Sequence, residues 1–256
     1  MNILVIGDVV GKVGRRALAC VLPGIRRSHS IDLVIANGEN AAGGKGLTPS
    51  TADEMFEAGV EIITSGNHIW HYREIYAYLD GEAPLLRPLN YPQGAPGRGV
   101  IARDGVAVIN LIGRTFMPGM LDCPFRAADE ALAQLADRRV IIVDMHAEAT
   151  SEKAALAWYL DGRVSAVIGS HTHIPTADTR VLPRGTAFVT DVGMVGPRDS
   201  ILGMETASVV DSFLSQLPTR FTTDERGPVV FNSVLVQVDP ETGRAGSIQR
   251  IDCEVA

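Results

Sequence analysis

Cysteine is scarce in this chain. Only three cysteines occur among the 256 residues, at Cys20, Cys123 and Cys253, and no Cys-x-x-Cys spacing exists. An odd number of widely separated thiols argues against a disulfide framework. The lack of paired thiolates also argues against a structural zinc site.

Long apolar runs and a leading targeting pattern are missing as well. No apolar run approaches the ~18–20 residues that a membrane span needs. No basic segment followed by a long apolar stretch opens the sequence, so no secretory signal is visible. We therefore expect a cytoplasmic protein with no membrane contact.

Positive charge is in deficit, with a formal net charge of −7, and aromatic residues make up 5% of the chain. Nonspecific nucleic-acid binding is driven by cationic neutralisation of phosphates, so this balance excludes a general nucleic-acid surface. No interleaving of basic and aromatic residues indicates a single-strand groove. A small phosphate ester stays compatible with this charge, because bound metals supply positive charge locally.

Two nucleotide-binding motifs are absent. The run Gly7-Asp-Val-Val-Gly-Lys-Val-Gly matches neither Gly-x-Gly-x-x-Gly nor the phosphate loop, in which Gly-Lys follows four spacer residues and precedes Ser or Thr.

Neither an internal repeat nor a low-complexity linker divides the chain. Hydrophobic residues make up 46% of it. Length and composition therefore predict one α/β domain over residues 1–256.

The chain does contain a regular alternation of apolar runs and helical stretches. This order predicts a largely parallel or mixed sheet that helices cover on both faces. Thr48-Pro49 is a good helix start, with a capping hydroxyl and a proline in the first turn. We predict helices over Arg15–His29, Pro49–Ala58, Tyr72–Leu79, Ala127–Leu135, Glu152–Leu160 and Glu205–Leu214.

Antiparallel strands are expected in addition. Gly99–Ala102 and Val106–Leu111 flank an Asp-Gly pair, which suits a tight hairpin turn. Val229–Val238 and Ser247–Cys253 flank an Asp-Pro-Glu-Thr-Gly turn and predict a second hairpin. The Pro- and Gly-rich segment 84–99 is expected to be irregular. Together these patterns predict an α/β fold with two packed mixed β-sheets and helices outside.

Residues that can bind a metal follow five of the apolar runs. Asp8 follows the first run of the chain, and His171 and His173 follow Ala166-Val-Ile-Gly-Ser. Ligands of open α/β sheets bind outside the carboxyl ends of the strands. Imidazole is the commonest metal-binding side chain. The full set of strand-end candidates is Asp8, Glu39, Asn40, Asn67, His68, His146, His171 and His173.

Each candidate taken alone has a structural explanation. Asp8 would suit a helix cap, Asn40 and Asn67 are typical turn residues, and a histidine such as His146 often makes a hydrogen bond at a sheet edge. Their joint occurrence after successive strands favours a dinuclear metal centre. The mixture of imidazole, carboxylate and amide oxygen suits iron, manganese or zinc better than magnesium or calcium alone.

The order of these motifs resembles the calcineurin-like metallophosphoesterase superfamily. The matching blocks are Gly7-Asp8, Gly38-Glu39-Asn40, Gly66-Asn67-His68, His146 and Ser170-His171-Thr172-His173. Four positions depart from the usual pattern of that superfamily: Val10 stands for His, Glu39 for Asp, Ile69 for an acidic residue and Ser170 for Gly.

These departures, together with Asn40 beside Glu39, look like the YmdB-type branch, which comprises bacterial cyclic-nucleotide phosphodiesterases. The runs Gly-Asp-Val-Val-Gly-Lys at 7–12 and Asn-Gly-Glu-Asn-Ala-Ala-Gly-Gly at 37–44 strengthen that closer resemblance. It implies a metallophosphoesterase-like four-layer sandwich. It also implies two metal ions, most often iron or manganese in this family and sometimes zinc.

The resemblance further implies a role for each residue. One metal would be held by Asp8, Glu39, Asn40 and His173. The other would be held by Glu39, Asn67, His146 and His171, with Glu39 as the bridge. His68 would stay off the metals as the general acid. The implied reaction is hydrolysis of a small phosphodiester, such as a 2′,3′-cyclic nucleotide, by a hydroxide that bridges the metals.

Two other functions stay open at this point. A regulatory protein would keep the metal centre and sense a ligand with little turnover, but His68 favours the enzyme. A metal amidohydrolase usually carries its His-x-His at the first strand, whereas here it comes last. His71 is left outside the site, and His29 suits a helix C-terminus. The segment Gly113–Pro124 fits a lid, an oligomer contact or an ordinary surface loop. The physiological substrate and any homo-oligomer are left open.

Overall fold

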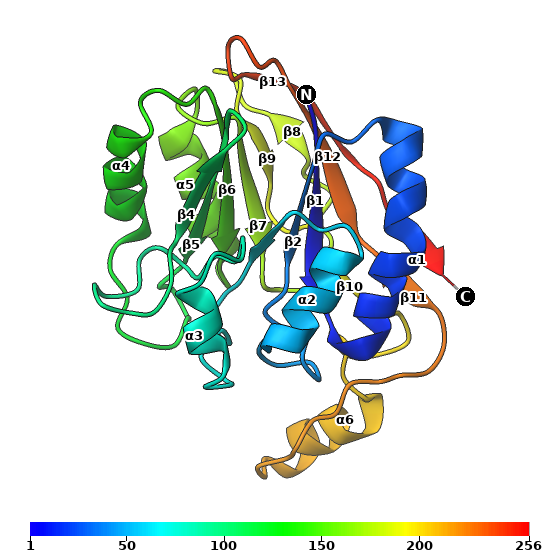
Figure 1. Cartoon of the computed structure of the whole chain (residues 1–256). Coiled ribbons are helices and arrows are strands. Elements are labelled where there is room, and N and C mark those ends of the chain that lie inside the picture. The colour runs from blue at the N-terminus through cyan, green and yellow to red at the C-terminus, as the bar shows by residue number, and fades with distance from the viewer. Residues whose placement is uncertain (256) are drawn as a thin grey trace.

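Two β-sheets pack face to face, and helices cover their outer faces (Figure 1). The computed structural model describes residues 1–255. One apolar core lies between the sheets. Each sheet also forms one further core with the helices that cover it. The four layers confirm the predicted α/β fold with two packed mixed sheets. Among residues 1–255, no helix combines the length and apolar character needed to cross a bilayer.

The first sheet is built around β1 (Asn2–Val9). On one side, β1 pairs in parallel with β2 (Leu33–Asn37), which pairs in parallel with β3 (Ile62–Thr64). On the other side, β12 (Ser233–Val238) runs antiparallel to β1, and β13 (Ala245–Arg250) pairs with β12. The carboxyl ends of β1, β2 and β3 therefore meet at one edge of the sheet.

Three short strands continue this sheet beyond the first residue of β12. β10 (Met194–Pro197) pairs in parallel with Asp8 and Val9 at the end of β1. β11 (Val229–Phe231) pairs with β10, and β14 (Cys253–Val255) pairs with β11. Around Gly7, β1 changes its partner from β12 to β10. This position requires a glycine, because a Cβ on Gly7 would meet the carbonyl oxygen of Gly193 at 2.1 Å.

The second sheet has a central parallel region. Its six strands occur in the order β4 (Val100–Arg103), β5 (Val106–Ile112), β6 (Val140–His146), β7 (Ala166–Ser170), β9 (Ala187–Val189) and β8 (Arg180–Val181). β5, β6, β7 and β9 are parallel, and β4 and β8 are antiparallel edges. β6 and β7 thus end side by side, at the same edge as the strands of the first sheet.

The helices agree with the predicted ones, with shifted ends. They are α1 (Gly11–His29), α2 (Pro49–Glu57), α3 (Ile75–Leu79), α4 (Pro124–Gln134), α5 (Thr150–Leu160) and α6 (Thr206–Ser215). α1 begins four residues earlier than predicted, because the N–H of Gly14 already donates to the carbonyl of Val10 at 3.1 Å. α3 is shorter than predicted, because residues 72–74 form a turn.

The first predicted hairpin is confirmed, since β4 and β5 are joined by Asp104 and Gly105 with φ of 50° and 82°. The second is partly wrong, because Val229–Val238 and Ser247–Cys253 each divide between two strands. Asn232 marks one division: its carbonyl accepts from Gly7 N–H, and its side chain accepts from Met194 N–H. The segment 84–99 contains no strand or helix, as predicted.

A buried ion pair supports the loop that follows β7. Lys153 on α5 and Asp191 are both fully buried, and Nζ lies 2.7 Å from Oδ2. The same oxygen accepts from the backbone N–H of Thr172 at 3.0 Å, and Oδ1 accepts from Gly193 N–H at 2.8 Å. Asp191 therefore connects the His171-Thr172-His173 loop to the chain beside β1.

Removal of the Lys153 charge should destabilise the fold strongly. We expect Lys153→Met to lower the free energy of unfolding by about 3–5 kcal/mol, because it leaves a buried carboxylate uncompensated. Arg163→Met removes the partly exposed pair with Asp129 and should cost under about 1 kcal/mol. Urea unfolding measures both. Equal losses in the two variants would contradict the prediction, and adding Asp191→Asn to Lys153→Met should recover part of the loss.

Candidate functional site

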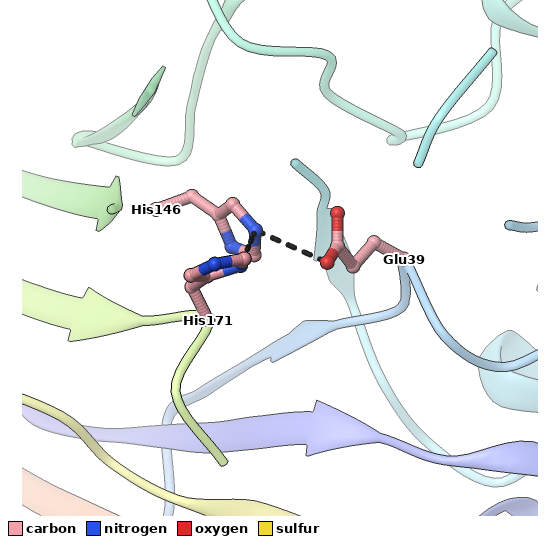
Figure 2. Close-up of side chains that lie close together, drawn as sticks. All are labelled: Glu39, His146 and His171. Carbon is pink, nitrogen blue, oxygen red and sulfur yellow. Dashed lines mark hydrogen bonds and ion pairs between the residues drawn. The ribbon is translucent and has the colours of Figure 1, made fainter. Parts of the chain in front are cut away.

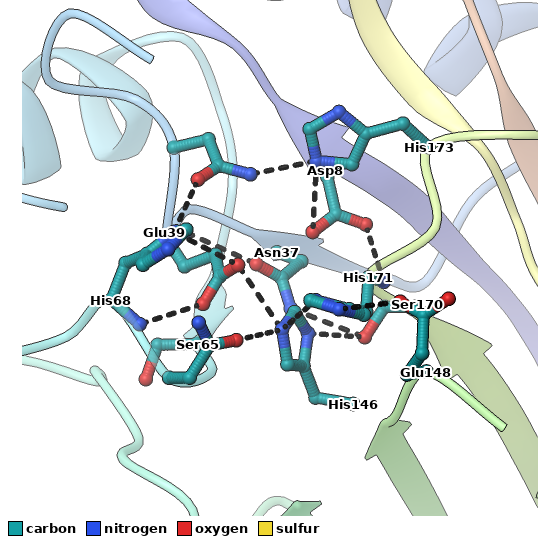
Figure 3. Close-up of polar contacts among 12 residues, drawn as sticks. Asp8, Asn37, Glu39, Ser65, His68, His146, Glu148, Ser170, His171 and His173 are labelled. Carbon is teal, nitrogen blue, oxygen red and sulfur yellow. Dashed lines mark hydrogen bonds and ion pairs between the residues drawn. The ribbon is translucent and has the colours of Figure 1, made fainter. Parts of the chain in front are cut away.

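The strand-end residues gather at one edge of the two packed sheets (Figure 3). Asp8 lies within β1 and His146 is the last residue of β6, so these two belong to their strands and do not follow them. His171 directly follows β7, and Glu39 lies two residues beyond β2. The site thus takes side chains from both sheets, at the carboxyl ends where α/β folds bind ligands.

Three side chains form a tight group of possible metal donors (Figure 2). One donor atom from each of Glu39, His146 and His171 lies within 4.8 Å of the other two. Nε2 of His146 lies 3.1 Å from Oε1 of Glu39 and 3.0 Å from Nδ1 of His171. The amide oxygen of Asn67 is 3.2 Å from the same Nε2. The structure thus brings these four residues together.

A second group adjoins the first. Oδ1 of Asp8 lies 3.9 Å from Nε2 of His173. The backbone N–H of His171 donates to Oδ2 of Asp8 at 3.1 Å, so the two groups share one loop. Asn40 is also here, with Nδ2 at 2.7 Å from Nε2 of His173. Its amide nitrogen therefore faces His173, and its amide oxygen faces Nδ1 of His68.

His68 lies at the open side of both groups. Its Nδ1 is 3.1 Å from the amide oxygen of Asn40 and 3.5 Å from Oε1 of Glu39. Its backbone N–H donates to Oε2 of Glu39 at 3.1 Å. The side chain keeps 30% of its surface exposed, against 1% for Glu39. The ring of His71 is edge-on to Tyr72 and has no hydrogen bond to the described donor residues, and its backbone N–H donates to the carbonyl of His68 at 3.0 Å.

Burial and mutual charge control protonation in this cluster. Burial raises the pKa of Asp8 to about 6, against the opposing effect of His173 and His146. Burial would also raise the pKa of Glu39, but the charge and hydrogen bond of His146 outweigh it and lower that pKa to about 2. Glu39 in turn raises the pKa of His146 to about 9 despite burial. Burial lowers the pKa of His171 to about 3 and also lowers that of His68.

The donor set fits metal ions on a direct structural criterion. Oδ1 of Asp8 is enclosed and has no hydrogen-bond partner among the described residues, and the enclosed Oε1 of Glu39 has only the ring nitrogens of His146 and His68 close to it. A buried carboxylate oxygen without a partner is costly, and a cation is one way to satisfy it. Imidazoles and carboxylates are donors that iron, manganese and zinc accept, once a bound metal displaces the ring proton.

Each histidine of the cluster is oriented by a partner on its far side. Nδ1 of His146 lies 3.0 Å from the hydroxyl of Ser170, and that hydroxyl donates to Asp144 at 2.7 Å. Nε2 of His171 lies 3.0 Å from the Glu148 carboxylate. Nδ1 of His173 lies 2.9 Å from the carbonyl oxygen of Leu202. Such partners decide which ring nitrogen faces a metal.

The backbone of the His-x-His loop is strained. His171 and His173 have backbone φ angles of 101° and 65°, values that residues other than glycine rarely adopt. Strain of this kind persists only where the surroundings impose it, and it concentrates at functional sites. The bonds from Asp8 and Asp191 to this loop supply that restraint.

The sequence patterns miss the residues behind the donors. Asp144 is buried beside Thr64, Ser170 and Asn37, and burial raises its pKa. A carboxylate inside the apolar run Val140–Met145 is a visible signal for such a residue. Ser170, at the usual Gly position of the superfamily, is another. Glu148 and Asp191 carry no comparable signal, because their partners are far away in the sequence.

Comparison with known proteins agrees with this site and fold. A family model described as YmdB-like protein matches residues 4–251. The chain is 48% identical over 256 residues to a 2′,3′-cyclic-nucleotide 2′-phosphodiesterase of Bacillus subtilis (strain 168), covering 98% of this chain and 96% of that protein.

Solved structures give the same result. A hypothetical protein from Thermus thermophilus has a TM-score of 0.93 at 45% identity and covers 100% of both chains. A novel phosphatase from Mycoplasma pneumoniae has a TM-score of 0.93 at 33% identity and covers 100% of this chain and 94% of that one. The resemblance read from Asp8, Glu39, Asn40 and the final His-x-His is therefore confirmed: the chain belongs to the YmdB-like family.

Proposed function

We propose that the chain is a dinuclear metal-dependent phosphodiesterase that hydrolyses small phosphodiesters, with 2′,3′-cyclic nucleotides as the preferred class. The carrying observation is the group Glu39, His146 and His171, whose donor atoms lie within 4.8 Å of one another beside the enclosed Oδ1 of Asp8, which has no partner among the described residues. The phosphodiesterase and phosphatase names of the relatives support the same reaction class.

In this proposal Glu39 would contribute to two metal-binding sets. Asp8, Asn40 and His173 complete one set, and Asn67, His146 and His171 complete the other. Asn40 would turn its amide on binding, because its nitrogen now faces His173. The donors suit iron, manganese or zinc, and the family resemblance puts iron first. Two bound cations would acidify a water and neutralise charge on the phosphate oxygens.

His68 would supply the proton for the leaving oxygen. Its backbone N–H is held by Glu39, and its Nδ1 is held near Asn40 and Glu39, so its position follows the metal-binding loop. Its partial exposure places the ring where a substrate can reach it. A positioned general acid of this kind contributes about 10²–10⁴-fold in rate. We further propose that the protein is cytoplasmic.

Metal analysis combined with a substrate panel tests the function. The panel holds 2′,3′-cyclic, 3′,5′-cyclic and aryl phosphodiesters. We expect about two metal ions per chain, turnover of the 2′,3′-cyclic esters, loss of turnover on chelation and recovery on metal addition. Full metal occupancy with no hydrolysis of any ester would contradict the proposal and favour the regulatory protein.

Removal of the His68 imidazole should separate metal binding from turnover. We expect His68→Ala to keep the metal content of the wild type and to lower kcat by about 10²–10⁴-fold. His71→Ala is the matched control, three residues further on and outside the cluster, and should turn over as the wild type does. Full activity of His68→Ala with normal metal would show that another group provides the proton.

Ser170 would fix the tautomer of His146. A serine hydroxyl has one proton, and that of Ser170 is donated to Asp144. Its oxygen is thus left to accept from Nδ1–H of His146, which makes Nε2, facing Glu39 and His171, the nitrogen that would give up its proton to a metal. Ser170 and Asp144 therefore act as positioning residues for one metal ligand.

Ser170→Ala should weaken metal binding by about 10–100-fold, because it removes the acceptor that orients His146. Competition with a chelator of known affinity measures this change. Ser165→Ala is the matched control. Ser165 is equally buried, accepts from Ile141 N–H and donates to Gly243, but precedes β7 where Ser170 ends it. Equal metal affinity in the two variants would leave Ser170 with only a structural role.

A further inference from the structure

A cavity of about 590 Å³ lies between α4 and the irregular segment 84–99. None of the proposed metal ligands lines it, and neither does His68. Its wall consists of Arg87, Leu89, Asn90, Tyr91, Gln93, Val100, Asp122, Cys123, Arg126, Ala127, Glu130, Ala131 and Gln134. Cavities of about 300–1,000 Å³ commonly hold small organic ligands.

Arg87 in this wall is a buried cation without a counter-charge. Only 8% of the residue is exposed. Its Nη1 donates to the carbonyls of Pro88 and Leu89 at 2.8 and 2.9 Å. Its Nε is enclosed and has no partner among the described residues. No carboxylate of residues 1–255 lies within 4.0 Å of this guanidinium. Burial lowers the pKa of Arg87, but a guanidinium stays charged in proteins.

The N-terminal end of α4 adds positive potential to the same cavity. The N-cap residue Cys123 offers no side-chain hydrogen bond, and the first turn contains no acidic residue. Arg126 lies in that first turn and lines the cavity. Asp122 and Glu130 also line it, but neither forms an ion pair with Arg87 or Arg126 in the described structure. An unpaired guanidinium, a second arginine and an uncapped helix start together favour an oxyanion.

We propose that this cavity binds an organic phosphate, whose phosphate group supplies the missing counter-charge of the Arg87 guanidinium and contacts Arg126. The volume exceeds what a bare phosphate fills, so the ligand carries an organic body. Leu89, Tyr91 and Val100 provide the surface for that body. This binding is separate from substrate binding at the metal centre and does not rest on the proposed function.

The cavity adjoins chain segments that support the metal centre. Asn90 in its wall accepts from Ile112 N–H at 2.9 Å and donates to the carbonyl of Ile112 at 2.8 Å. The next residue, Gly113, donates to the carbonyl of His146 at 2.9 Å. Tyr91 packs edge-on against Trp70, with ring centroids 5.2 Å apart. A ligand in the cavity would therefore contact the segment that ends beside His146.

Crystals of the metal-loaded protein soaked with tungstate, an anomalous scatterer shaped like phosphate, test the site directly. We expect a tungstate within hydrogen-bond distance of the Arg87 guanidinium, in addition to any at the metals. Tungstate at the metals alone, or at neither place, would overturn the proposal. This measurement uses the wild type, so it decides the matter even if a variant of Arg87 fails to fold.

Calorimetric titration of the metal-loaded protein identifies the source of the ligand. One arm uses adenosine 3′-monophosphate, a product of the proposed reaction, and the other uses ribose 5-phosphate. We expect one binding event beyond the metal centre in at least one arm. It should be weakened on the order of tenfold or more in Arg87→Met and in Arg126→Gln. Arg103→Gln, an exposed arginine on β4 away from the cavity, is the matched control. Unchanged binding in Arg87→Met would overturn the proposal.

Discussion

The contact between Glu39 and His146 joins the two sheets at the edge where their strands end. Glu39 follows β2 of the first sheet and His146 closes β6 of the second, and Oε1 and Nε2 lie 3.1 Å apart with both side chains buried. This contact exists only because apolar side chains of both sheets form one shared core beneath it. Burial strengthens the electrostatic coupling between the two groups, which is why each shifts the pKa of the other so strongly.

A layer of buried polar groups maintains this arrangement from behind. Asp144 and Ser170 hold His146, and Lys153 with Asp191 holds the loop after β7. The positive φ angles of His171 and His173 show what that support achieves: it keeps the loop in a conformation that an unsupported chain would leave.

The departures from the wider superfamily are accommodated by packing. Val10, where the superfamily usually has a histidine, is fully buried, and a Cβ on Gly203 would meet its side chain at 2.6 Å. Ile69, at the usual acidic position, belongs to the core beneath α1 and α2. Two places that carry polar side chains elsewhere thus contribute to the apolar interior here, and Asn40 stands beside Glu39 on the side that faces Asp8 and His173.

The sequence by itself determined the alternation of strands and helices, the position of polar residues at strand ends and the family. These are local properties, because a period of two or of 3.6 residues and a turn dipeptide are visible within a few neighbours. Such periodicity cannot resolve strands as short as β8, β9 and β10, with two to four residues each. It also cannot find the division at Asn232. The apolar run continues on both sides of this residue, but β11 before it pairs with β10 and β12 after it pairs with β1.

Only the tertiary structure decided which donors meet and how each is oriented. Asn40 and His173 are 133 residues apart in sequence, and Lys153 and Asp191 are 38 apart. Such contacts are set by how two sheets and their covering helices pack, a property of the whole core. The direction of the Asn40 amide, the ring nitrogen that His146 presents and the isolation of the Arg87 charge therefore came from packing and not from any pattern along the chain.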